Sequence, residues 1–194
     1  DFGLITIRNK YSISSNPYLF SIGTIQPRKN FSRVIHALKR LRDRGYDLHL
    51  VIAGGKGWLE DEMYQTIEAL NMRDLVHLIG FVDDEDVAGL YSGAECVVFP
   101  SLYEGFGFPV IEGMACGTPV ITSNVSSLPE VAGDAAIMVD PYDIDAITDA
   151  IQRVLDDNTL RDRMIQAGFE QASKFTWEKS ARQLHEIYMQ VLAM

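Results

Sequence analysis

Cysteine is scarce in this sequence, and no segment is apolar over a long stretch. The two cysteines, Cys96 and Cys116, both lie in apolar segments. We therefore expect buried free thiols in a reducing compartment rather than a disulfide framework. No apolar run approaches the ~20 residues that a membrane-spanning helix requires, and the N-terminal residues lack a signal-peptide pattern. The sequence thus predicts a cytoplasmic protein without a transmembrane segment.

Positive charge is also in short supply. The 194 residues include 17 basic and 27 acidic side chains, which gives a net charge of −10. A surface of that sign disfavours nucleic acid and anionic membranes, so any anionic ligand must be held by a local site. The four histidines show no metal-ligand spacing with each other or with cysteine. Nucleic acid is therefore not an expected partner.

What the sequence does have is a regular alternation of short apolar segments with amphipathic ones. From Tyr18 onward, the predicted strands are "YLFSIG", "LHLVIAGG", "LVHLIGF", "ECVVFPS", "TPVIT" and "AIMVD". Helical periodicity follows at residues 31–41, 59–70, 144–156, 159–173 and 177–192, and Asn30 is expected to cap the first of these helices. Apolar strands that alternate with helices predict a doubly wound α/β domain with a parallel, Rossmann-like sheet.

The pattern divides the chain into three parts. Residues 1–17 are polar without a clear period, and we interpret them as a linker or the tail of an N-terminal domain. Residues 18–175 hold the alternating strands and helices of the Rossmann-like domain. Residues 176–194 form a last helix that follows another helix with no strand between them, so the C-terminal helices are expected outside the sheet.

Ligands of such domains bind at the carboxyl ends of the strands, where the strand order reverses. This rule brings together the loops that follow Gly23, Ala53 and Pro100. The first loop carries Arg28 and Lys29, and two adjacent cations can hold a diphosphate. The alternative is a solvated pair before a helix. Neither "GGKG" nor "GFGFPV" matches a dinucleotide fingerprint or a phosphate-binding P-loop.

The loop "SLYEGFGFPVIEG" places Glu104 before Gly105 and Gly107, with Glu112 eight positions after the first acid. A helix is expected to begin near Pro109, because proline fits the first helical turn. Its unpaired N–H groups and the helix dipole then favour a phosphate or an array of sugar hydroxyls. The alternative is a strand-to-helix turn whose glycines serve steric needs and whose Glu112 complements the dipole.

The sequence resembles the donor-binding C-terminal domain of the retaining GT-B glycosyltransferases of group 1, which include many bacterial mannosyl- and glucosyltransferases. The resemblance runs from about Tyr18 to the C-terminus. It is carried by "SIGTIQPRKN", "VIAGGKG", "LIGFVDDEDVAGLYSGAECVVFPSLYEGFGFPVIEGMACGTPVITS" and "FTWEKSARQLHEIY". It implies a Rossmann-like domain that forms the C-terminal half of a GT-B fold, with extra C-terminal helices.

The resemblance also implies site roles. Glu104 contacts the transferred sugar as the catalytic residue, and Glu112 accepts hydrogen bonds from the nucleotide ribose. The other implied donor-binding residues are Arg28 and Lys29 at the leaving diphosphate, the N–H groups around Gly105, Phe106 and Gly107 at the sugar hydroxyls, and Phe81 and Val82 against the base. One departure is Thr24, where many members have arginine, and it puts the strength of the phosphate contact in doubt.

No metal and no other cofactor are expected. Asp84 and Asp86 match the Asp-x-Asp pattern by which other glycosyltransferases hold a metal ion. These acids open a predicted helix, however, where negative charge is favoured by the dipole. We interpret them as a helix start.

The predicted function is transfer of a hexose from a nucleoside diphosphate sugar to a saccharide acceptor with retention, in polysaccharide biosynthesis. The run "GTIQPRKN" looks like bacterial mannosyltransferases and favours GDP-mannose. The resemblance further implies an N-terminal acceptor-binding domain, and residues 176–194 would contact it. That domain would allow peripheral binding at the inner membrane face. Without it, this chain would be inactive. Alternatives are a nucleotide-sugar epimerase or a glycogen-type phosphorylase of the same fold, or a non-catalytic nucleotide-binding module.

Overall fold

Parallel strands form the centre of the fold. The computed structural model describes residues 2–58 and 61–193, and within these ranges six strands pair in the order β3-β2-β1-β4-β5-β6. Every pairing is parallel. The strands are β1 (Tyr18–Ile22), β2 (His49–Ala53), β3 (Val76–Gly80), β4 (Cys96–Phe99), β5 (Val120–Ser123) and β6 (Ile137–Val139). The strand order reverses between β1 and β4, which confirms the predicted doubly wound sheet.

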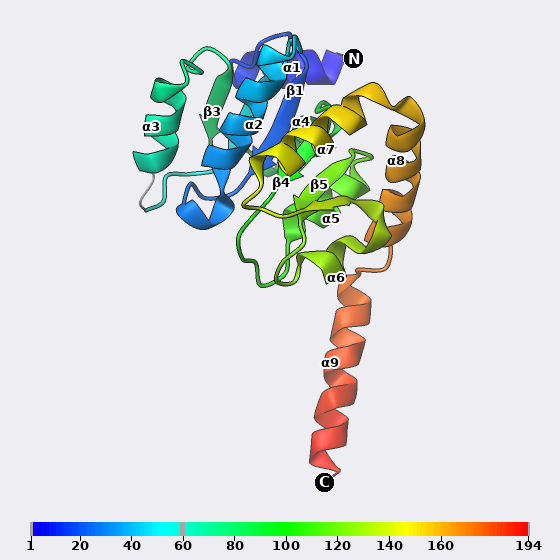
Figure 1. Ribbon diagram of the computed structural model, residues 1–194. Helices are drawn as coiled ribbons and strands as arrows, with labels where there is room; N and C mark the ends of the chain where they lie inside the picture. Colours follow the sequence, from blue (N-terminus) through cyan, green and yellow to red (C-terminus); the bar gives the residue numbers. More distant parts are fainter. Residues whose placement is uncertain (1, 59–60, 194) are drawn as a thin grey trace.

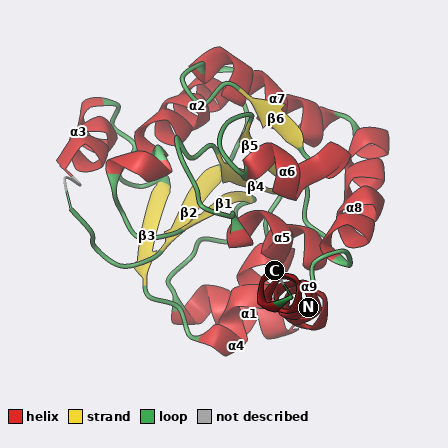
Figure 2. Cartoon of the chain, turned by 90° about the horizontal axis from the view of Figure 1, so that it is seen from below, coloured by secondary structure: helices red, strands yellow, loops and turns green. Residues whose placement is uncertain are grey.

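Helices cover both faces of this sheet, as Figures 1 and 2 show. The helices are α1 (Phe2–Lys10), α2 (Phe31–Asp43), α3 (Asp61–Ala69), α4 (Asp84–Ser92), α5 (Phe108–Ala115), α6 (Leu128–Ala132), α7 (Ile144–Asp156), α8 (Asn158–Ala172) and α9 (Trp177–Leu192), with 3-10 turns η1 (Pro27–Lys29) and η2 (Gly133–Ala135). One core lies between the sheet and helices α2, α3 and α7. The other lies between the sheet and helices α4, α5 and α6. The strands β1, β2, β4 and β5 are buried almost throughout, which explains why the sequence has solid apolar runs there.

Helix α1 forms where the sequence shows no helical period. It lies against α4, and Ile7 packs so closely that a Cβ on Gly89 would come within 2.2 Å of the Ile7 side chain. Lys10 forms ion pairs with Asp83 at 2.7 Å and with Asp86 at 2.5 Å. Contacts with the rest of the fold therefore stabilise a helix that its own sequence pattern does not indicate.

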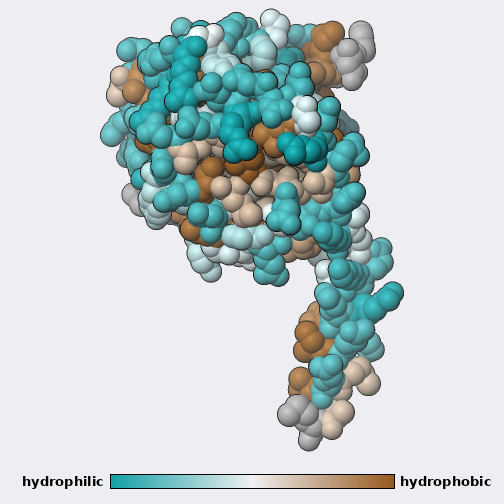
Figure 3. Space-filling view, turned by 45° about the vertical axis from the view of Figure 1, so that its right-hand side comes forward, coloured by the Kyte–Doolittle hydropathy of each residue, from teal (hydrophilic) through white to brown (hydrophobic). Residues whose placement is uncertain are grey.

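Helix α9 extends away from the body of the fold (Figures 1 and 3). None of the α9 side chains that the structure describes is buried. Its apolar residues Leu184, Ile187, Tyr188 and Val191 are about half exposed or more, and Figure 3 shows hydrophobic surface, in brown, on this helix. Only its first turn meets the body, where the Trp177 and Phe108 rings lie 6.4 Å apart.

The helix boundaries agree with the expected ranges, with two differences. The helix expected at residues 59–70 is observed as α3 (Asp61–Ala69), while Leu59 and Glu60 lie outside the described residues. Asn30 precedes α2 but makes no side-chain capping hydrogen bond, so that prediction is wrong.

Both cysteines are free, as expected, but only Cys96 is buried, whereas Cys116 is half-buried. Burial raises the pKa of the Cys96 thiol to about 12. Among the described residues, no helix combines the length and apolarity that crossing a membrane requires.

Candidate functional site

The loops after β1, β4 and β6 are tied together beside the point where the strand order reverses. The Asn30 side-chain amide donates hydrogen bonds to the backbone oxygens of Pro100 at 2.9 Å and of Pro141 at 2.7 Å. The Leu102 N–H donates to the Arg28 oxygen at 2.8 Å. Asn30 therefore joins three segments. Its side-chain oxygen, the atom that would cap α2, instead accepts a hydrogen bond from the Arg33 side chain at 2.7 Å, which is the physical reason for the failed capping prediction.

At this junction the structure brings Arg28, Lys29 and Glu104 into direct contact. Lys29 Nζ lies 2.8 Å from Glu104 Oε1, and an Arg28 guanidinium nitrogen lies 2.6 Å from Glu104 Oε2. The Lys29 and Glu104 side chains are only 10% and 11% exposed, whereas Arg28 is 36% exposed. Each carboxylate oxygen therefore has its own cation, one buried and one at the surface. We call these three residues the charged triad.

The path of the Lys29 side chain to Glu104 depends on a glycine, Gly23. A Cβ on Gly23 would come within 2.8 Å of Lys29 Cε, and Gly23 has φ +144°. The Lys29 ammonium also lies 4.6 Å from the centre of the Phe99 ring, at cation–π distance. Gly23, which follows β1, is thus required by its backbone angle and because a side chain there would block the path of the Lys29 side chain.

Glu104 is ionised at neutral pH despite its burial. Burial alone would raise the pKa of the carboxyl, but hydrogen bonds from Lys29 and Arg28 outweigh it and hold the pKa below the usual value. The negative charge is therefore stable only while cations, or groups that replace them, face it.

The glycine turn after Glu104 leads into α5. Helix α5 begins at Phe108 with Pro109 in its first turn, which confirms the predicted start. Gly107 has φ +118°, and a Cβ there would meet Leu128 at 2.6 Å, whereas a Cβ on Gly105 would meet no atom within 4 Å. Protein packing therefore requires Gly107 but leaves the space beside Gly105 open.

Backbone donors in this turn are unused. Within the described part of the chain, the N–H groups of Gly105, Phe106 and Gly107 make no hydrogen bond. They lie at the N-terminal end of α5, where the helix dipole adds partial positive charge. Free donors next to two cations form a site suited to oxygen-rich anionic ligands.

Two serines that sequence reasoning missed hold the turn in place. The Glu104 N–H donates to Ser126 Oγ at 3.0 Å, and Ser127 Oγ donates to the oxygens of Glu104 at 2.9 Å and Phe106 at 2.7 Å. Both serines follow β5, which ends at the same edge of the sheet as β4. Because the two strands end at the same edge of the sheet, the position of both serines directly after β5 could have indicated that they lie near Glu104.

Glu112 has a different environment from Glu104. It lies on α5, and its Oε2 accepts a hydrogen bond from the Tyr91 hydroxyl at 2.7 Å. Tyr91 is fully buried in α4, and burial followed by the charge of Glu112 raises the pKa of this phenol far above its usual value. A neutral hydroxyl therefore positions Glu112, whose residue remains exposed to solvent. The sequence analysis did not identify Tyr91.

Phe81 and Val82 lie apart from the charged triad, at the end of β3. The Phe81 side chain is 87% exposed, and a Cβ on Gly55 would meet its ring at 2.4 Å. Phe81, but not Val82, borders a cavity of about 290 Å³ whose other lining residues are Ile25, Gly54, Gly55, Lys56, Tyr64, Leu78 and Gly80. Backbone hydrogen bonds join the loops in sequence, from Gly23 to Ala53 and from Gly54 to Gly80. The cavity and the triad thus share one edge of the sheet.

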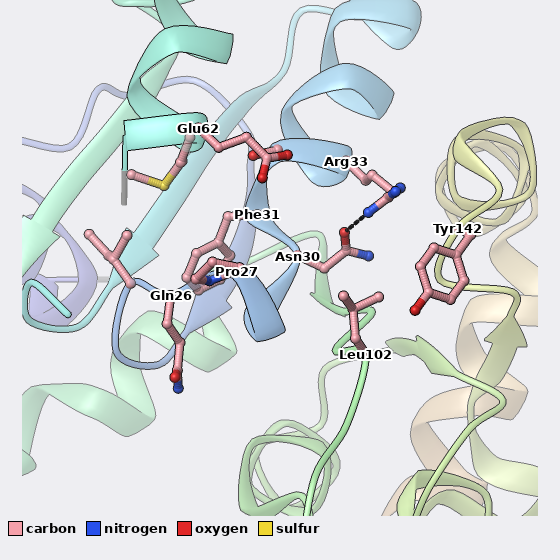
Figure 4. Close-up of a pocket in the computed structure, with 11 residues that line it drawn as sticks. Gln26, Pro27, Asn30, Phe31, Arg33, Glu62, Leu102 and Tyr142 are labelled. Carbon is pink, nitrogen blue, oxygen red and sulfur yellow. Dashed lines mark hydrogen bonds between the residues drawn. The ribbon is translucent and has the colours of Figure 1, made fainter. Parts of the chain in front are cut away.

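A second cavity, of about 190 Å³, lies at the start of α2 (Figure 4). It is lined by Ile25, Gln26, Pro27, Asn30, Phe31, Ser32, Arg33, Glu62, Met63, Leu102 and Tyr142. Arg33 donates to the Asn30 side-chain oxygen at 2.7 Å, as the dashed line in Figure 4 marks. None of the predicted site residues lines this cavity, so it is separate from the candidate site.

The acids at residues 83–86 begin α4, as predicted, with Asp83 preceding the first helical residue. Hydrogen bonds from Lys10 and then Tyr11 lower the pKa of Asp86. Over residues 2–58 and 61–193, no group of three or more His, Cys, Asp or Glu side chains is placed to hold a metal ion. The absence of a metal requirement stays a prediction.

Comparison with known proteins shows consistent similarities. The family model described as glycosyl transferases group 1 matches residues 5–171. The chain is 38% identical over 185 residues to O-antigen chain mannosyltransferase B from Escherichia coli, covering 95% of this chain and 49% of that protein. It is 36% identical over 172 residues to MMP alpha-(1->4)-mannosyltransferase from Mycolicibacterium hassiacum, covering 86% and 41%.

A solved structure agrees with these relatives. Sucrose-phosphate synthase from Thermosynechococcus elongatus superposes with a TM-score of 0.83 at 30% identity, covering 97% of this chain and 49% of that one. The chain therefore spans about half the length of the curated relatives it matches.

Proposed function

The chain belongs to the group 1 glycosyl transferases and has the architecture of one half of a GT-B fold, and we propose that it is the donor-binding half of a retaining hexosyltransferase. It binds a nucleoside diphosphate sugar at the carboxyl edge of its sheet. An N-terminal acceptor-binding domain of the same protein completes the cleft, and this chain alone transfers little sugar.

The observation that carries the proposal is the charged triad beside unused backbone donors. Arg28 and Lys29 are two cations at hydrogen-bond distance from one carboxylate in a protein of net charge −10. A diphosphate carries more negative charge than Glu104 and can draw these cations to itself. Glu104 is then left free to face the sugar, whose hydroxyls meet the N–H groups of the glycine turn.

The same groups supply the chemistry. Departure of the nucleoside diphosphate develops negative charge, which preorganised cations and the α5 dipole stabilise. The sugar becomes oxocarbenium-like, and the Glu104 carboxylate favours its positive charge. Glu112, held by Tyr91, accepts hydrogen bonds from the ribose. Phe81, Val82 and the adjacent cavity receive the base, and the cations replace the metal ion that other glycosyltransferases use.

The donor we propose is GDP-mannose. The names of two relatives, O-antigen chain mannosyltransferase B and MMP alpha-(1->4)-mannosyltransferase, support mannose as the sugar. The run "GTIQPRKN" supports the same choice. The acceptor is a saccharide in polysaccharide synthesis, and the protein acts in the cytoplasm, at the inner membrane face where its N-terminal half provides contact.

The apolar face of α9 supports the proposed second domain. Leu184, Ile187, Tyr188 and Val191 lie on one helix with no buried partner among the described residues. Burying such side chains stabilises an interface by ~25 cal/mol per Å² of apolar area. We propose that this face packs against the N-terminal acceptor-binding domain.

The test is a donor screen on the full-length protein. GDP-mannose at 100 times its dissociation constant should stabilise the fold by ~2.7 kcal/mol, measured as a thermal shift against UDP and ADP sugars. The transferred sugar should keep the anomeric configuration of the donor, as read by NMR of the product. No stabilisation by any nucleotide sugar would refute the proposal. Sugar isomerisation without transfer would indicate an epimerase, and binding without turnover a nucleotide-binding module.

A further inference from the structure

One buried side-chain polar atom stands apart from the others in the described part of the chain. In the described residues, Ser101 Oγ is the buried side-chain oxygen or nitrogen that makes no hydrogen bond. Ser101 directly follows Pro100 at the end of β4 and is 0% exposed. Buried hydroxyls are nearly always paired, so an unpaired one beside a candidate active site calls for a functional reason.

The backbone around this hydroxyl is held firmly. The Ser101 oxygen accepts a hydrogen bond from Ser123 Oγ at 2.6 Å, and the preceding Pro100 oxygen accepts one from Asn30. The Leu102 N–H donates to Arg28. The backbone on both sides of Ser101 is therefore fixed, and the residue is 0% exposed.

Glu104 lies three residues away, and both of its oxygens are engaged by Lys29 and Arg28. Burial raises the pKa of Glu104, whereas Lys29, Arg28 and, more weakly, Ser101 lower it. The Ser101 hydroxyl thus lies close enough to act on the carboxylate, yet it does not make a hydrogen bond of ordinary geometry in the ligand-free arrangement.

We propose that Ser101 is a positioning residue. When a nucleoside diphosphate draws Arg28 and Lys29 away from Glu104, Ser101 replaces them as the hydrogen-bond donor to Glu104. Its hydroxyl then donates to the carboxylate and holds it ionised toward the sugar. This role rests on the proposed function. Without such a donor, a half-buried carboxylate that loses two cations would protonate more readily.

The test compares S101A with S21A in the full-length protein. Ser21 is also fully buried, but its hydroxyl donates to the Val98 oxygen at 2.7 Å, so S21A removes a hydrogen bond that already exists. S21A should lower the melting temperature by a few degrees and leave turnover unchanged. S101A should leave the melting temperature nearly unchanged, because its hydroxyl has no partner to lose.

The kinetic expectation is specific to the donor-bound state. S101A should lower kcat about 10-fold, while the donor KM and the affinity for free nucleoside diphosphate change little. The acid limb of kcat should move to higher pH, since Glu104 then loses a hydrogen-bond donor, and the acid limb of kcat/KM should move less, since the cations still face Glu104 in the free enzyme. S101C, which keeps a weak donor of similar size, should recover part of both effects.

Each alternative result overturns the proposal. Unchanged kcat and an unmoved acid limb in S101A would show that Glu104 does not need the hydroxyl. A melting temperature lowered as much as in S21A, with both limbs unmoved or moved equally, would show a structural role. E104Q is measured alongside. Full turnover in E104Q would refute the proposed function and this inference together, whereas inactive E104Q with unaffected S101A would refute this inference alone.

Discussion

Glu104 and Glu112 lie eight residues apart in one loop and helix, yet they differ in burial and in the charge of their partners. The Glu104 side chain is 11% exposed and faces two cations, at 2.8 and 2.6 Å. Glu112 is exposed and faces a neutral Tyr91 hydroxyl. A carboxylate balanced by cations responds to any ligand that competes for those cations. A carboxylate held by a neutral hydroxyl keeps its place whether or not the ligand is charged.

This contrast indicates a division of labour between the two acids. Under the proposed function, the partners of Glu104 bind the diphosphate, so donor binding would change the surroundings of Glu104 directly. Glu112 has no cation partner among the described residues, so under the proposed function its ribose contact would be similar in the ground and transition states. An interaction of that second kind contributes to binding rather than to turnover.

The largest expected effect comes from E104Q in the full-length protein. We expect the turnover number to fall by ~10²-fold or more, the scale for loss of one oriented electrostatic group. E112Q is the matched control, and it should weaken donor binding while partly sparing turnover. Steady-state kinetics on both variants measures the difference. Full turnover in E104Q with none in E112Q would mean that the two roles are reversed.

The next effect concerns Lys29, the buried cation of the charged triad. K29A should weaken nucleoside diphosphate binding by ~1.5–3 kcal/mol, the range for a charged hydrogen bond. K39A is the control, because Lys39 forms an ion pair with Asp43 on the outside of α2. Calorimetry should show that K39A binds the nucleoside diphosphate with the same affinity as wild type. Unchanged affinity in K29A would remove Lys29 from the diphosphate site.

A smaller effect is expected in the pH dependence of stability. The pKa of Glu104 is lower in the folded protein than the ~4.3 of an unfolded glutamate. The contribution of Glu104 is therefore fully present above the unfolded pKa and is lost as pH falls through the folded pKa, below about pH 4. Denaturant unfolding of wild type and E104Q should show a stability difference at pH 6 that shrinks toward pH 3. A difference independent of pH would contradict the ionised triad.

The smallest effect is expected on removal of divalent metal, which should leave the activity unchanged. If Arg28 and Lys29 supply the charge that a metal ion would otherwise provide, as we propose, the full-length protein should keep its activity in excess EDTA. Activity measured before and after Mg²⁺ is restored serves as the control. A requirement for Mn²⁺ or Mg²⁺ would return Asp84 and Asp86 to consideration.

Much of the fold was predictable because its signals are local. Solid apolar strands and the periods of α2, α7, α8 and α9 lie within single segments, and the confirmed parallel sheet follows from their alternation. The meeting of Arg28, Lys29 and Glu104 was also predictable, since the carboxyl ends of adjacent parallel strands share an edge.

The missed features all depend on contacts between distant segments. Helix α1 is stabilised by α4 rather than by its own pattern. The sequence analysis did not identify Tyr91, whose hydroxyl the fold places against Glu112. The sequence predicts Asn30 as a helix cap, but in the fold its side-chain oxygen accepts from Arg33 and its amide donates to Pro100 and Pro141. Polar side chains with several possible partners cannot be assigned before the topology is known.

The most direct test of the central claim is one titration performed on three proteins. A single nucleoside diphosphate is titrated by calorimetry into wild type, E104Q and E112Q, all in the full-length form. Glu104 competes with the ligand for Arg28 and Lys29, so E104Q should bind the diphosphate more tightly than wild type, even though its turnover is lost. E112Q should bind more weakly, because a ribose contact is impaired. Shifts of the same sign in both variants would contradict the account.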